Sequence, residues 1–162
     1  MLINSIFISG ISQEFEYLGN LTSEDGLSQN TVNCLIQDSQ GFLWIGTQDG
    51  LSRYDGREFL IYQNNPADTN SLSNNYVLSL CEDQNGIIWI GTMSGGLNRL
   101  DPRTGWFTVF DNDPEDPGTI SDNNIWSVVT DDENNIFAGT NKGLNVLYHN
   151  SNTFTCFNHN EN

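Results

Sequence analysis

The chain has 162 residues, 36% of them hydrophobic, which is enough to bury a sizeable core. Its 21 Asp and Glu residues outnumber 5 Lys and Arg residues, for a formal net charge of -16. Such a surface repels the phosphate backbone of nucleic acids, so nucleic acid is excluded as a partner. The acidic residues are dispersed along the chain, as expected for turns and a soluble surface.

The first elements in chain order are two short segments ahead of the main pattern. Residues 1–12 are uncharged and mostly apolar, and Gly10 and Ser12 flank Ile11 as small residues flank a signal-peptide cleavage site. No basic residue precedes them, so we interpret residues 1–12 as a signal-peptide remnant, with an added strand as the alternative. Apart from this segment, no apolar stretch is long enough to insert into a membrane.

Residues 13–25 are interpreted as a strand and a linker. The aromatic run at 15–18 precedes the first repeat just as the run at 59–62 precedes the second repeat. A run in that position suits the outer strand of the last blade of a ring, supplied by the N-terminus.

Three segments then repeat one order of short apolar runs: residues 26–70, 71–118 and 119–162. Each segment has four runs rich in β-branched and aromatic residues, separated by turns of Asp, Asn and Gly. The third copy is degenerate, and Asn134 stands where its turn glycine is expected. Four strands per 40 to 50 residues are typical of a propeller blade, so we predict an all-β fold of three four-stranded antiparallel β-propeller blades.

One aromatic residue and one glycine two positions later recur in each copy. We expect the aromatic side chain to form a wedge between neighbouring blades, and the glycine to let the next blade approach closely. A sugar-stacking role for these aromatics is the less favoured alternative. The structural blade positions are Trp44, Gly46, Trp89, Gly91, Phe137 and Gly139.

No residue pattern indicates catalysis, a cofactor or a metal. His149 and His159 lack a readable nucleophile or carboxylate partner. The acidic loop at 111–118 lacks the terminal glutamate of an EF-hand and is interpreted as a proline-stiffened loop. Cys34, Cys81 and Cys156 form no close pair and are predicted to be small core residues.

Segments 26–32, 43–47 and 50–55 resemble the two-component regulator propeller repeat. The resemblance covers about residues 15 to 157 and is stronger in the first two copies. It implies the N-terminal periplasmic sensor of a hybrid two-component histidine kinase, with the kinase itself in a domain absent from these residues. Three blades and one strand do not close a ring, so the expected partners are the remaining propeller blades or further copies of the chain.

Ligand-binding candidates are the positions that differ between repeats at the start of the innermost strand. They are Asn33, Tyr76, Asn124 and Trp126. Aromatic stacking and amide hydrogen bonds suit an oligosaccharide, with core or channel lining as the alternative role. The predicted function is ligand sensing in a phosphorelay receptor. A protein-interaction scaffold and a carbohydrate-active enzyme are the alternatives.

Overall fold

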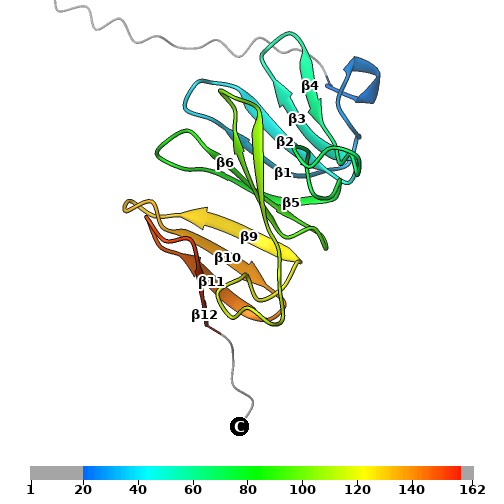
Figure 1. The fold of residues 1–162 in the computed structure, drawn as a ribbon. Coiled ribbons are helices and arrows are strands. Elements are labelled where there is room, and N and C mark those ends of the chain that lie inside the picture. Colours follow the sequence, from blue (N-terminus) through cyan, green and yellow to red (C-terminus); the bar gives the residue numbers. More distant parts are fainter. Residues whose placement is uncertain (1–19, 158–162) are drawn as a thin grey trace, which may run out of the picture.

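A computed structural model describes residues 20–157 of the chain. It contains three four-stranded antiparallel sheets, each with its strands in sequential order, which lie one after another as successive blades (Figure 1). The predicted all-β fold class is thus confirmed. The signal segment and the closing strand expected at 15–18 lie outside the described residues.

Each sheet is built from one continuous stretch of the chain. A short 3-10 helix, η1 (Ser23–Asp25), precedes the first sheet. The first blade comprises β1 (Val32–Gln37), β2 (Leu43–Thr47), β3 (Gly50–Tyr54) and β4 (Phe59–Tyr62). The second comprises β5 (Val77–Glu82), β6 (Ile88–Thr92), β7 (Leu97–Asp101) and β8 (Trp106–Phe110). The third comprises β9 (Ile125–Thr130), β10 (Ile136–Thr140), β11 (Gly143–Leu147) and β12 (Phe154–Phe157).

An aspartate organises the hairpin between the first two strands of each blade, and it is buried in the first two blades. In the first blade, Asp38 Oδ1 accepts hydrogen bonds from the backbone N–H groups of Gln40 and Phe42, at 3.0 and 2.9 Å. Asp83 and Asp131 accept the equivalent bonds in the other two blades. The turn also needs one residue with positive φ, and Asn134 takes this conformation at 66° where the other blades have glycine.

The hydrophobic core is divided between the two blade interfaces. In the first interface, Trp44 and Leu51 pack with residues of the second blade such as Val77 and Ile90. In the second interface, residues of β6 and β7 pack with those of β9 and β10. Each blade is therefore held by its neighbours, because a single four-stranded sheet cannot bury its own two faces.

Close approach between blades depends on the repeated glycine. A Cβ atom at Gly46 would lie 2.5 Å from Val77 Cγ1, and one at Gly91 would lie 2.7 Å from Ile125 O. The aromatic two residues earlier, Trp44 or Trp89, is buried in the same interface. The glycine thus leaves room for a β-branched side chain at the start of the next blade.

Two partly buried thiols, Cys34 and Cys81, should make the stability of the fold depend on pH in the alkaline range. Burial raises the pKa of Cys34 to about 11 and that of Cys81 to about 12. An unfolded cysteine has a pKa of about 8.5, so above that pH unfolding releases protons that the folded chain retains. Stability from these groups is complete below about pH 8.5 and is lost as pH rises toward their folded pKa values.

We therefore expect the free energy of unfolding, measured in urea, to fall between pH 8 and pH 11. Burial also raises the pKa of Tyr62, which acts in the same direction. The control is the Cys34→Ala/Cys81→Ala variant, whose stability should fall less steeply over this range. Equal slopes for the two proteins would contradict the prediction.

Candidate functional site

The starts of β1, β5 and β9 lie at one end of the blades, where the first strand of one blade meets the β-hairpin of the blade before it. Gly50 N–H donates to Asn75 O at 2.8 Å, and Gly96 N–H donates to Asn123 O at 2.9 Å. These bonds join the turn between the second and third strands to the residues just ahead of the next blade. We call this end of the blades the strand-start face.

Tyr76 and Asn124 lie on the strand-start face and are bonded across a blade interface. Gln48 Nε2 donates to the Tyr76 hydroxyl at 3.1 Å. Ser94 N–H donates to Asn124 Oδ1 at the same distance. In both cases a hairpin residue of one blade contacts the first-strand region of the next. These two side chains therefore help to fix the angle between blades.

Asn33 and Trp126 occupy equivalent positions but differ in what they offer a ligand. Asn33 Nδ2 donates to Val77 O at 2.8 Å, so its amide is engaged between the first two blades. Trp126 is 51% exposed, and its indole N–H donates to Asn141 Oδ1 at 2.7 Å. That bond orients the indole while much of its apolar surface stays in contact with solvent. Trp126 is therefore the predicted residue best placed for stacking.

Two side chains of this face were missed by the sequence prediction. Gln48 and Asn141 both come from the turn between the second and third strands, and they hold the Tyr76 and Trp126 side chains. The sequence did mark this position: it directly follows the threonine that ends the second strand, and its residue type differs between the repeats. The Gln48–Tyr76 contact crosses from the first blade to the second, whereas the Asn141–Trp126 contact lies within the third blade, and only the three-dimensional structure shows these pairings.

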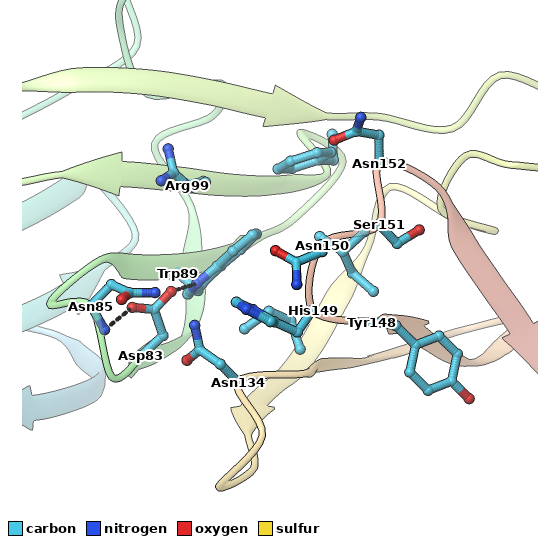
Figure 2. A pocket seen from close by; sticks show the side chains of 13 residues that line it. Asp83, Asn85, Trp89, Arg99, Asn134, Tyr148, His149, Asn150, Ser151 and Asn152 are labelled. Carbon is cyan, nitrogen blue, oxygen red and sulfur yellow. Dashed lines mark hydrogen bonds between the residues drawn. The ribbon is translucent and has the colours of Figure 1, made fainter.

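A cavity of about 210 Å³ lies at the opposite end, between the second and third blades (Figure 2). Trp89 and Arg99 come from the second blade, and Asn134, His149 and Asn150 come from the third. The Trp89 indole N–H donates to Asp83 Oδ2 at 3.0 Å. Trp89 is buried, so the cavity offers mainly polar groups. It can hold a small polar molecule but has little apolar surface for stacking a sugar ring.

Three carboxylates with a lowered pKa lie in turns or at the end of a strand next to a turn. The guanidinium of Arg103 lowers the pKa of Asp101, to which it donates at 3.0 and 3.1 Å, and the Asn135 amide lowers the pKa of Asp131. Backbone N–H groups, that of Glu58 first, lower the pKa of Asp55. Each carboxylate is an acceptor in its own turn, which is a structural role. Within residues 20–157, no group of three or more His, Cys, Asp or Glu side chains is placed to hold a metal ion.

Comparison with protein families gives a match to the two component regulator propeller model at residues 26–49 and 71–94. The chain is also similar to histidine kinase P4 of Formosa agariphila, with 52% identity over 50 residues. That alignment covers 31% of this chain and 4% of the kinase. The matched residues 26–49 and 71–94 include the first two strands of the first and second blades.

Two solved structures share the fold. One is the extracellular domain of a protein described as a hybrid two component system, BT3049 of B. thetaiotaomicron, with a TM-score of 0.80 and 31% identity over 86% of this chain. The corresponding domain of BT4673 from the same organism gives a TM-score of 0.64 and 29% identity over 85% of this chain.

The chain spans only a small part of these relatives: 20% of the BT3049 domain and 17% of the BT4673 domain. Across residues 20–157, no helix is long and apolar enough to cross a membrane. The repeats and the shared fold thus define a propeller segment of the kind found outside the cell in hybrid two-component systems.

Proposed function

Since this chain carries the repeats of the two-component regulator propeller family, we propose that it is a ligand-sensing segment of a two-component signal-transduction receptor. The observation that carries this proposal is the likeness, over 86% of the chain, to the extracellular domain of a hybrid two-component system. The segment would lie in the periplasm or outside the cell. Kinase activity would belong to another domain of the receptor.

We further propose that the ligand is a glycan fragment bound at the strand-start face. An exposed indole held by Asn141 offers a flat apolar surface for a sugar ring, as in many carbohydrate sites. Amides and hydroxyls of Gln48, Tyr76 and Asn124 lie at the same end of the blades and can exchange hydrogen bonds with sugar hydroxyls.

Replacing Trp126 with alanine should weaken binding of an oligosaccharide by about fivefold or more, because stacking on an aromatic ring contributes about 1 kcal/mol or more. The measurement is calorimetric titration of the whole chain with a panel of neutral and acidic oligosaccharides. Tryptophan fluorescence gives a second readout, since a sugar stacked on Trp126 changes its emission.

The matched control is Trp106→Ala. Trp106 is 62% exposed but lies on β8, the outermost strand of the second blade. This control should bind oligosaccharides as the wild type does. Equal losses in both variants would place the sugar elsewhere, and no binding by the wild type to any oligosaccharide would contradict the glycan proposal for this segment.

A further inference from the structure

The cavity between the second and third blades contains a half-buried arginine without an anionic partner. Arg99 lies on β7, beside Trp89 of β6, and both side chains line the cavity of about 210 Å³ (Figure 2). Within residues 20–157, the one ion pair joins Arg103 and Asp101, so the guanidinium of Arg99 has no carboxylate partner there. An arginine carries five N–H donors, which makes this group the strongest donor that the cavity offers.

The carboxylates closest to the cavity are bound to other donors. Asp83 lines the cavity, but it accepts hydrogen bonds from the Trp89 indole and from two backbone N–H groups of its own turn. Asp101 lies two residues after Arg99 on β7, and its carboxylate is held by the guanidinium of Arg103 at 3.0 and 3.1 Å. The donors of Arg99 therefore remain available to a molecule in the cavity.

The equivalent arginine of the first interface, Arg53, is engaged by aromatic rings. Its guanidinium packs over the Phe42 ring at 4.7 Å and over the Trp44 ring at 5.8 Å. In the second blade, Ile87 stands at the position of Phe42, so Arg99 lacks that ring. The second interface thus repeats the arginine without the phenylalanine that covers it in the first interface.

The wall across the cavity from Arg99 is an uncharged polar loop. Residues 148–152 join β11 to β12 and take the place of residues 101–105 in the second blade, yet they include no Asp, Glu, Lys or Arg. The backbone N–H of His149 donates to Asn135 Oδ1 at 2.8 Å, which holds this loop against the hairpin between β9 and β10. The loop contributes amide, hydroxyl and imidazole groups to the cavity, from His149, Asn150, Ser151 and Asn152.

We propose that this cavity binds a small molecule bearing a carboxylate or a sulfate group, of about the size of one sugar acid, with the guanidinium of Arg99 as the anchor. The planar guanidinium presents two parallel N–H groups, which match two oxygens of such an anion. The amides of Asn150 and Asn152 can exchange hydrogen bonds with hydroxyl groups elsewhere on the same molecule. The volume of about 210 Å³ is below the roughly 300 Å³ at which sites for drug-sized ligands begin, so the occupant is small.

This site is separate from the strand-start face, because the two lie at opposite ends of the blades. The proposal therefore does not rest on stacking at Trp126, and the two sites can be tested independently. A charged anchor and a polar wall recognise an anionic group, whereas an exposed indole recognises an apolar sugar face.

The test is calorimetric titration of the full chain with glucuronate, and with glucose as its uncharged counterpart. Glucuronate should bind at least about tenfold more tightly than glucose, because hydrogen bonds between charged groups are stronger than those between neutral groups. Glucose 6-sulfate replaces the carboxylate by a sulfate ester, and the tighter of the two ligands identifies the preferred anion. Fluorescence of Trp89 gives a second readout, since its indole lines the cavity.

Arg99→Gln should weaken glucuronate binding by about tenfold or more, and Arg99→Lys should lose less, because lysine keeps the charge but not the paired donors. Arg57→Gln is the matched control: it removes the same charge from an exposed turn of the first blade and should bind glucuronate as the wild type does. Thermal melts check that each variant is folded.

Three results would overturn the proposal. The first is a wild type that binds neither glucuronate nor glucose 6-sulfate more tightly than glucose. The second is a folded Arg99→Gln variant with the affinity of the wild type. The third is a loss of glucuronate binding in Trp126→Ala but not in Arg99→Gln, which would place the anion at the strand-start face.

Discussion

Replacing Gly91 with valine is expected to destabilise the fold by about 3 kcal/mol or more, a large fraction of the roughly 5–15 kcal/mol by which domains are ordinarily stable. A Cβ atom at this position would collide with the Ser79 hydroxyl and would lie 2.7 Å from Ile125 O and 2.9 Å from Ile125 Cγ2. One of these atoms is backbone of the neighbouring blade, so a change of rotamer cannot relieve the overlap. The second and third blades would have to separate.

The measurement is the urea midpoint of unfolding followed by circular dichroism. Gly139→Val is the matched control, because a Cβ atom at this equivalent glycine would meet nothing closer than Ser127 Cβ at 3.7 Å. The control should be as stable as the wild type or slightly more stable, since valine favours a strand and glycine does not. Similar losses in both variants would mean that the glycine matters for its own strand rather than for the interface.

Replacing Trp44 with phenylalanine is expected to cost about 2 to 4 kcal/mol. Trp44 is fully buried, and its indole N–H donates to Asp38 Oδ2 at 2.8 Å. Phenylalanine leaves a cavity and removes the donor from a carboxylate that is only 6% exposed. A buried carboxylate oxygen without a partner is costly.

The third blade shows how this loss can be reduced. There Phe137 replaces the tryptophan, and Asn135 Nδ2 donates to Asp131 Oδ2 at 2.9 Å instead. Position 42 of the first blade is equivalent to position 135. Adding Phe42→Asn to Trp44→Phe should therefore recover about 1 kcal/mol of the lost stability.

The rescue is measured by a double-mutant cycle in urea. Phe42→Ala in the Trp44→Phe background is the control and should recover nothing, because alanine has no donor for Asp38. Arg53 packs over the Phe42 ring at 4.7 Å, so both changes at position 42 lose that contact equally. If Phe42→Asn and Phe42→Ala gave equal stability in the Trp44→Phe background, the proposed exchange of donors would be contradicted.

The sequence repeat alone predicted the three four-stranded sheets, because the position of each strand is set locally, by a short apolar run and by the turn residues on either side of it. The segment at 43–47 is β2, and the apolar run at 59–62 is β4. The turn role of Asn134 was readable for the same reason, since its positive φ is a property of a single residue.

The candidate site was less predictable, because it depends on how blades meet. Asn33 was proposed as a ligand-binding residue, yet its amide bonds to Val77 O of the next blade. The exchange of donors between Trp44 and Asn135 was also not foreseen, since it requires knowing that two positions reach the same aspartate oxygen. Spacing along the chain gives the strands but not the atoms that face each other across an interface.

The arrangement of each sheet from one uninterrupted stretch has a consequence for biosynthesis. A blade needs only residues already synthesised to complete its own hairpins, and it then waits for the following blade to cover its apolar side. Within residues 20–157, no sheet takes a strand from another part of the chain, so folding of these blades can follow the order of translation. The most recently completed blade always exposes one apolar face, and the rate of translation determines how long that face stays uncovered.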